Sequence, residues 1–168
     1  MSDRGRKIYI ILTIAVPFLL YCIYYYSIMV GNAPYKFTEF KSIQFKSSLG
    51  GNVRSLYNSS TGEYQYINKH DSVIKTKVLL SKDELQALHR KATDLGFWNF
   101  PEKELGDTSV VNGHQVPHFY IQFNYKRKSK TVNYEPNFNG DAKLKTANEQ
   151  MIKAILKALS EAEVRQLK

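Results

Sequence analysis

The longest apolar segment of the chain constrains its organisation more than any other feature. Residues 8–30 read IYIILTIAVPFLLYCIYYYSIMV and include no charged side chain. As a helix that rises about 1.5 Å per residue, this segment measures roughly 34 Å, more than the roughly 30 Å of a bilayer's hydrocarbon core. Pro17 lies within it, and membrane helices tolerate an interior proline. The segment therefore predicts a single transmembrane anchor.

The residues that flank this segment predict its orientation. Arg4, Arg6 and Lys7 precede it directly, and lysine and arginine are enriched on the cytoplasmic side of membrane helices. Tyrosines at residues 24–26 suit the headgroup region at the far end. We therefore expect a signal-anchor in a bacterial inner membrane, with the N-terminus in the cytoplasm. The expected parts are a basic cytoplasmic leader (1–7), the anchor (8–30), a stalk (31–41) and a periplasmic or extracellular α+β domain (42–168).

Two other interpretations of the N-terminal segment stay open. In the first, the segment is a lipoprotein signal, because Leu19-Leu20-Tyr21-Cys22 ends in a cysteine that could carry lipid, although Tyr21 is larger than the residue such signals prefer. In the second, it is a cleaved signal peptide, for which Gly31-Asn32-Ala33 is the only site with small residues at the required spacing. All three interpretations place the body of the chain outside the cytoplasm.

Composition limits what the body can be. The chain has 168 residues, of which 43% are hydrophobic and 13% aromatic, enough for one packed domain beyond the N-terminal segment. Its one cysteine, Cys22, lies in that segment, so the body has no disulfide and no thiolate metal site. The net charge is +9, and the first thirty residues contribute +2 of it. The remaining +7 favours anionic neighbours.

Alternation of apolar and polar residues predicts an antiparallel sheet in the body. Segments with strand-like pattern or composition are 43–49, 53–57, 63–68, 72–80, 118–126 and 130–135. In the fourth of them, apolar side chains share one face and lysines share the other, as in a sheet with one face in water. Short turns separate most of these segments, which favours antiparallel pairing of neighbours.

Two capping boxes predict where helices begin. Ser81-Lys-Asp-Glu84 precedes apolar residues at helical spacing, and Gly96 is a glycine of the kind that ends helices. Thr146-Ala-Asn-Glu149 precedes a broad apolar stripe that reaches Leu159. The predicted fold class is therefore α+β: an antiparallel sheet of five to six strands with two helices packed on one face, preceded by a single transmembrane helix.

Two features are candidates for an interaction surface. Lys126, Arg127, Lys128 and Lys130 form the densest positive cluster, at the tip of a predicted hairpin. Such charges keep a sheet edge soluble, or they bind an anionic lipid, polymer or nucleic acid. Trp98 lies among aromatic residues that either close the core below the first helix or form a ligand platform. Nucleic acid is not expected as a partner, because an extracytoplasmic domain rarely meets it.

The sequence contains no pattern that predicts catalysis. His114 and His118 are four residues apart, but at a junction of loop and strand rather than on a helix, where this spacing would bring two ligands together. His89 is expected at the surface or boundary of the first helix. Neither a nucleophile elbow nor a glycine-rich phosphate loop is present. We therefore expect no enzyme activity, no cofactor, no metal and no small-molecule substrate.

Fold-making motifs run through most of the body. They are the turn Gly50-Gly51, the hairpin around residues 63–66, the helix start Leu80-Ser81-x-x-Glu84-Leu85-x-x-Leu88, the segment Leu95-Gly96-Phe97-Trp98-x-Phe100-Pro101 and the strand Lys130-Thr131-Val132. With these motifs the chain resembles small secreted or lipid-anchored bacterial domains of unknown function. Its order of strands and helices is also similar to that of emfourin-type protein inhibitors of metalloproteases. The resemblance implies a fold and carries over no catalytic residues.

These observations predict a membrane-tethered, extracytoplasmic protein-interaction module whose partner is another envelope protein. Tethering raises the effective concentration of such a module near its partner. The first alternative is an inhibitor of an envelope protease that uses the polar loop 102–117. The second is a lipoprotein domain that binds an anionic envelope polymer.

Overall fold

The chain divides into two units, Met1–Pro34 and Tyr35–Lys168. A computed structural model describes residues 3–32, 35–68 and 70–166. The first unit is helix α1 (Asp3–Asn32), which contains Pro17. Within α1, the described side chains are those of Tyr9 and of residues 11–26, and most of them are exposed.

The structure contradicts the prediction of a transmembrane anchor at residues 8–30. Among the residues that it describes, no helix combines the length and the apolar character needed to cross a membrane. The single-pass signal-anchor and the inner-membrane location inferred from it are withdrawn with the anchor.

Several predictions about the N-terminal segment fall on residues outside the described set. The side chains of Arg4, Arg6 and Lys7, on which the orientation depended, lie outside it, as do Ala33 and Pro34 beside the candidate cleavage site. Cys22 is a free, half-buried cysteine of α1, and lipid attachment there stays a prediction.

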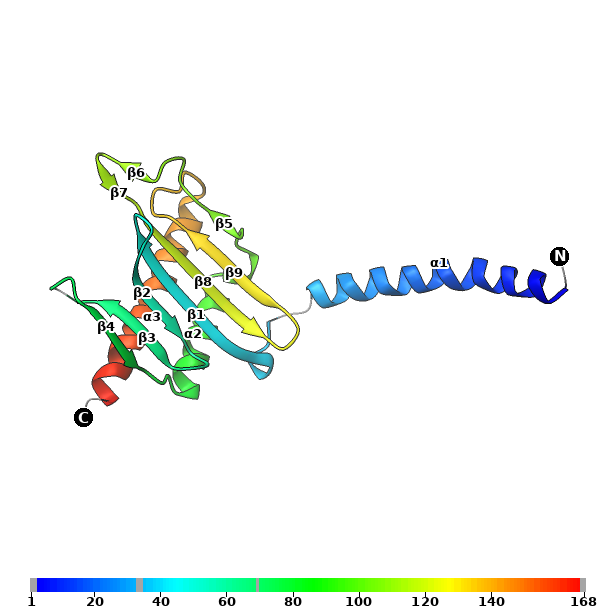
Figure 1. Ribbon diagram of the computed structural model, residues 1–168, viewed down its shortest axis with the longest axis horizontal. Helices are drawn as coiled ribbons and strands as arrows, with labels where there is room; N and C mark the ends of the chain where they lie inside the picture. Colours follow the sequence, from blue (N-terminus) through cyan, green and yellow to red (C-terminus); the bar gives the residue numbers. More distant parts are fainter. Residues whose placement is uncertain (1–2, 33–34, 69, 167–168) are drawn as a thin grey trace. The chain divides into compact units, whose positions relative to one another are not determined.

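A seven-stranded sheet forms the second unit, with the strand order β4-β3-β2-β1-β8-β9-β5 (Figure 1). Its strands are β1 (Phe40–Leu49), β2 (Asn52–Asn58), β3 (Glu63–Ile67), β4 (Val73–Lys77), β5 (Lys103–Glu104), β8 (Pro117–Tyr125) and β9 (Ser129–Tyr134). Neighbouring strands pair antiparallel, except that β5 runs parallel to β9. A separate hairpin consists of β6 (Val110–Val111) and β7 (His114–Gln115).

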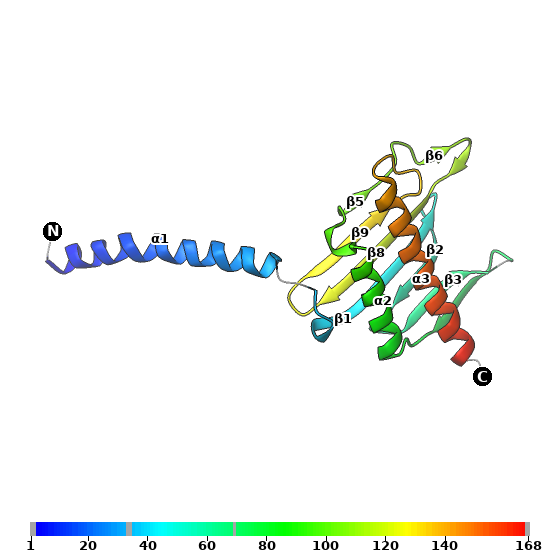
Figure 2. The same ribbon diagram turned by 180° about the vertical axis from the view of Figure 1, so that it is seen from behind.

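Both helices of this unit cover the same face of the sheet. They are α2 (Lys82–Asp94) and α3 (Ala142–Gln166), and Figure 2 shows them lying in front of the strands. Side chains alternate along a strand, so every second residue of the central strands faces the helices. These residues form the core with α3, and Ile43, Phe45, Ile121, Phe123, Val132, Ile155 and Leu159 are all fully buried. Neither of these two helices covers the opposite face, which we call the open face (Figure 1).

The two predicted capping boxes had different outcomes. At α2 the box is present: the Ser81 hydroxyl accepts from the Glu84 amide and the Glu84 carboxylate accepts from the Ser81 amide. Gly96, at φ 71°, follows the helix in the left-handed conformation that favours glycine. The predicted start at Thr146 is wrong, because α3 begins at Ala142. The carboxylate of Asp141 accepts from the Lys143 amide and so caps the helix one turn earlier.

The fold-class prediction is wrong in two further respects. The sheet has seven strands rather than five or six, and one of its pairs is parallel. The extra strands β5, β6 and β7 fall within residues 102–117, where two-residue strands leave no detectable period. Backbone contacts with the end of β9 hold β5, as in the bond from the Glu135 amide to the Glu104 carbonyl at 3.0 Å.

The predicted stalk is also partly a folded element. Residues 35–41 belong to the second unit, where a 3-10 turn, Phe37–Glu39, leads into β1. Tyr35 stacks on Trp98 with ring centroids 4.6 Å apart. The domain therefore begins seven residues earlier than the expected boundary at residue 42.

Candidate interaction surfaces

Three of the five residues predicted for an interaction surface lie together at the tip between β8 and β9. Lys126 and Arg127 are exposed, and the Lys126 amide donates to the Glu39 carbonyl at 2.9 Å. The guanidinium of Arg127 lies 3.8 Å from the Glu39 carboxylate, a long and exposed ion pair. Lys128 places its ammonium 3.9 Å from the centroid of the Tyr35 ring, a cation–π contact.

Tyr35 connects this tip to the body of the domain. Its ring stacks on Trp98 and meets Tyr125 edge-on at 5.0 Å, and its hydroxyl donates to the Ser129 carbonyl at 3.4 Å. This role was not predicted, because residues 31–41 have no strand or helix pattern that would place Tyr35 in the folded domain. Tyr35 is the residue through which the structure brings Lys128 and Trp98 near each other.

The other two predicted residues take part in packing. Lys130 is half-buried on the helix-covered side of β9, where its ammonium donates to the Phe100 carbonyl and burial lowers its pKa. Trp98 is half-buried against Phe97 and Phe123, and its indole N–H donates to the Thr93 hydroxyl at 3.1 Å. Neither side chain belongs to the cluster of exposed charges at the tip.

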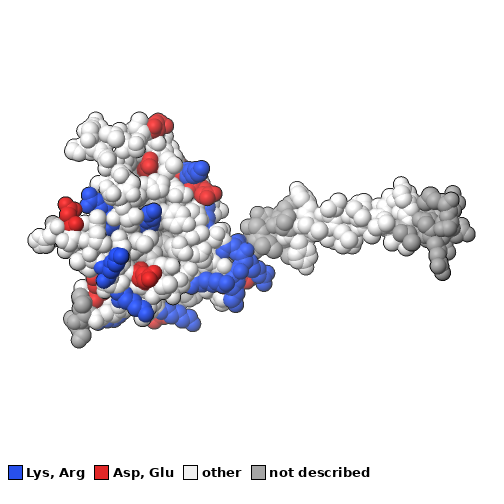
Figure 3. All heavy atoms as spheres, in the orientation of Figure 1, with Lys and Arg blue, Asp and Glu red and all other residues white. Residues whose placement is uncertain are grey.

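Further cations from a separate segment join the tip and complete a surface that we call the basic corner. Phe40 of β1 pairs with Tyr125 of β8, which brings the residues that flank this pair together. Figure 3 shows lysine and arginine gathered at this end of the open face. The basic corner consists of Lys36, Lys41, Lys126, Arg127 and Lys128, with Glu39 among them.

The open face carries a second candidate surface, built on one row of paired residues. In successive strands, Asn133 pairs with Tyr120, Tyr120 with Lys46, Lys46 with Leu56, Leu56 with Gln65 and Gln65 with Lys75. We call these six residues the cross-strand row. Their side chains lie half-buried or exposed on the face that the helices leave uncovered. None of this row was predicted, because register decides which residues meet.

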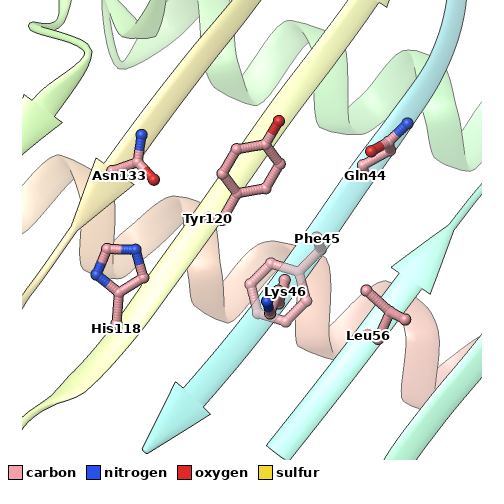
Figure 4. Close-up of a pocket in the computed structure, with 7 residues that line it drawn as sticks. All are labelled: Gln44, Phe45, Lys46, Leu56, His118, Tyr120 and Asn133. Carbon is pink, nitrogen blue, oxygen red and sulfur yellow. The ribbon is translucent and has the colours of Figure 1, made fainter. Parts of the chain in front are cut away.

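Hollows lie along this row. One of them, of about 380 Å³, is lined by Gln44, Phe45, Lys46, Leu56, His118, Tyr120 and Asn133 (Figure 4). A hollow of about 240 Å³ on β2, β3 and β4 shares Leu56 with it. A third, of about 160 Å³ beside the turn Gly50-Gly51, shares His118 with it. The three hollows therefore adjoin one another and form a trough across the open face.

Most polar side chains of the trough make few hydrogen bonds or ion pairs with the described residues of the domain. Gln44, Lys46 and Tyr120 make no side-chain hydrogen bond or ion pair with any residue that the structure describes. The amide nitrogen of Asn133 donates to the Glu102 carbonyl at 3.3 Å, which leaves its oxygen available. His118 Nδ1 lies 3.3 Å from the Glu135 carboxylate at one end of the trough.

The histidines do not assemble a metal site. Within the described residues, no three His, Cys, Asp or Glu side chains are grouped so that they could hold an ion. His114 is exposed on β7, whereas His118 lies on β8 beside Glu135. The prediction that His89 is a surface or boundary residue is wrong. It is 8% exposed, its Nε2 lies 3.2 Å from the Tyr35 carbonyl, and burial lowers its pKa.

The resemblance to emfourin-type inhibitors and to small secreted bacterial domains stays a prediction. Comparisons with protein-family models, with curated proteins and with solved structures found no match to this chain. The assignment of a function therefore depends on the geometry of the two surfaces described above, the basic corner and the trough.

Proposed function

We propose that this chain is a non-catalytic protein-interaction module that binds an extended segment of a partner protein in the trough. The observation that carries the proposal is the cross-strand row. It places an amide, a phenol, a lysine, a leucine, a second amide and a second lysine in one line across six strands. These groups face solvent, and four of the five polar ones have no side-chain hydrogen-bond partner among the described residues.

The length of the row favours an extended peptide as the occupant. Six neighbouring strands, spaced about 4.8 Å apart, span roughly 24 Å, which about seven residues of extended chain would cover. The side chains of Gln44 and Gln65 carry both an N–H donor and a carbonyl acceptor, as does the main chain of a peptide. Leu56 is 43% exposed and offers an apolar contact midway along the row.

The shape of the trough argues against a small molecule. Sites for small ligands are concave, mostly apolar and bury most of the ligand surface. The trough is open along one side of a sheet and so would leave much of a small ligand in solvent, and it has lysines at two positions in its row. A partner protein supplies its own surface to cover such a site.

A display experiment tests the proposal. Random peptides of about 12 residues would be selected against the full chain, and the affinities of the enriched peptides would be measured by fluorescence anisotropy. We expect Tyr120→Ala to weaken binding about tenfold or more, since tyrosines at the centre of interfaces carry much of the binding energy. Lys46→Gln should weaken binding of peptides that contain an acidic residue.

Lys153→Gln, an exposed change on α3, is the matched control and should leave the affinities unchanged. Peptides that bind the two trough variants as tightly as the unchanged chain would overturn the proposal. Selection of no binding peptide from repeated libraries would also count against it.

The β6–β7 hairpin favours a second candidate function, inhibition of a protease. It exposes Val110 at 50% and Val111 at 41%, although most exposed residues of small domains are polar. Asn112 and Gly113 form its turn with positive φ values of 51° and 77°, the conformation of a tight hairpin. An exposed apolar loop held on a scaffold has the form required to occupy a protease cleft.

Inhibition assays of the full chain against a panel of metalloproteases and serine proteases would test this second candidate. We expect inhibition that Val110→Asp with Val111→Asp removes and that Lys153→Gln retains. If the chain slows no protease, or if the aspartate variant inhibits equally well, the hairpin is not an inhibitory loop.

A further inference from the structure

We infer that the basic corner binds an acidic segment of the partner protein whose extended part occupies the trough. The inference rests on the proposed function in taking the partner to be a protein with an extended segment in the trough. The corner and the trough are joined by β1, which carries Lys41 of the corner and Gln44 of the trough, three residues or roughly 10 Å apart. One partner can therefore reach both surfaces.

The backbone segments that carry the charges of the basic corner are held together by the fold. The backbone bond from the Lys126 amide to the Glu39 carbonyl joins the two segments that supply them. The Tyr125 amide donates to the Lys128 carbonyl at 2.9 Å, which closes the hairpin tip. A preorganised cluster loses less conformational entropy on binding than lysines on a loose loop.

The balance of charge at the corner favours an anionic partner. Residues 35–41 and 125–130 contain Glu39 as their only carboxylate, against the five cations of the corner. The guanidinium of Arg127 is 69% exposed, and its 3.8 Å contact with Glu39 satisfies it weakly. Repulsion among these cations is relieved when an anion binds.

Aromatic contacts at the corner favour a peptide over nucleic acid. Proteins that bind single-stranded nucleic acid offer free aromatic faces on which bases stack. The Tyr35 ring instead contacts Lys128 and Trp98, and Phe37 stacks on Phe40 with centroids 5.4 Å apart. These rings contact residues of the domain itself and so do not offer free faces on which bases could stack.

Glu39 favours a peptide over a uniformly charged polymer. Its carboxylate is 31% exposed and lies among the cations, so a polymer with an anion on every unit would place one of them near it. A peptide can instead place a neutral residue there and donate a backbone N–H to the carboxylate. Lysine ammonium groups suit the flexible carboxylates of glutamate and aspartate as point charges.

Binding to the full chain of a fluorescein-labelled decapeptide that alternates glutamate and glycine tests the inference, because this peptide can place a neutral residue beside Glu39. At low salt, about 50 mM, we expect binding that weakens steadily as salt rises, because surface charges are screened. A variant with Lys41→Gln, Lys126→Gln and Arg127→Gln should bind about tenfold more weakly, since each exposed ion pair contributes about twofold in affinity.

The matched control replaces three exposed lysines of α3, Lys143, Lys153 and Lys157, with glutamine and so removes the same net charge. It should keep most of the affinity. Equal weakening in the control, or no weakening in the corner variant, would overturn the inference. So would tighter corner-dependent binding of polyphosphate or of a thymidine decanucleotide than of the peptide.

The test separates this inference from the proposed function. Binding of the glutamate–glycine peptide depends on the corner and should be unchanged by Tyr120→Ala, whereas selected trough peptides should respond to that substitution. If only the trough experiment fails, the corner still stands as a site for acidic peptides. If only the corner experiment fails, the trough still stands as the site of an extended peptide.

Discussion

Glu104 is a fully buried carboxyl group whose surroundings favour its neutral form. One of its oxygens accepts from the Asn148 amide at 2.6 Å, and the other has no hydrogen-bond partner among the described residues. The side-chain oxygen of Asn148 is buried and equally unpaired. Burial raises the pKa of Glu104, and a proton on the carboxyl would supply the donor that this pair lacks.

Replacement of this residue, Glu104→Gln, should therefore change how stability depends on pH. Because the folded state raises the pKa above its ordinary value of 4.5, the group stabilises the fold most below that value. This contribution is lost as pH rises through the folded-state pKa. We expect the variant to lose less stability than the unchanged chain between pH 4.5 and pH 7, measured by urea unfolding.

Glu161→Gln, a change at an exposed carboxylate of α3, serves as the control and should not alter the slope. If Glu104→Gln destabilises the chain equally at every pH, the carboxyl is ionised in the folded state and the assignment fails.

Arg165 and Glu84 join the C-terminal end of α3 to the first turn of α2. The guanidinium of Arg165 donates to both oxygens of the Glu84 carboxylate, at 2.5 and 3.1 Å. These bonds, with those from Ser81, lower the pKa of Glu84 to about 2. A carboxyl with a lowered pKa stabilises the fold above its ordinary value of 4.5 and loses this contribution as pH falls toward 2.

We therefore expect Arg165→Gln to lower the unfolding midpoint at pH 7 and to make the loss of stability between pH 4.5 and pH 2 shallower. Circular dichroism during urea unfolding measures both. Lys157→Gln removes the exposed Lys157–Glu161 pair of α3, and it should change neither quantity appreciably. An unchanged acid slope in Arg165→Gln would show that the bidentate contact does not form in solution.

At the scale of elements, local patterns predicted the long strands and missed the short ones. The alternation of apolar and polar residues predicted β1, β2, β8 and β9. One face of each strand packs against the core, so every second side chain is buried. The capping box located α2 because both partners lie within four residues. β5 was missed since its two residues are held by β9, about thirty positions later in the chain.

The start of α3 shows how two local signals compete. Asp141 and Thr146 are both residues that cap helices, and each precedes residues that favour a helix. The earlier cap adds another turn, in which Leu144 packs against the core, and the next turn carries Asn148, which reaches Glu104. Those tertiary contacts cannot be inferred from the spacing within the helix itself.

At the scale of the whole molecule, the two surfaces differ in how far the sequence predicts them. Residues 126–128 are adjacent in the chain, so their charge was evident before the fold was known. Lys36 and Lys41 join them only through the pairing of β1 with β8. The cross-strand row takes one residue from each of six strands, and a shift of register by one residue would turn each side chain to the other face.

The most direct test of the central claim is a titration of the isotope-labelled full chain with a peptide selected for binding, followed by nuclear magnetic resonance. A peptide in the trough should shift the amide resonances of Tyr120, Lys46 and Gln65 in one contiguous band across the open face. It should leave the exposed surface of α3 unaffected. Shifts confined to α2, α3 or the β6–β7 hairpin would contradict the claim that this chain binds its partner across the uncovered face of its sheet.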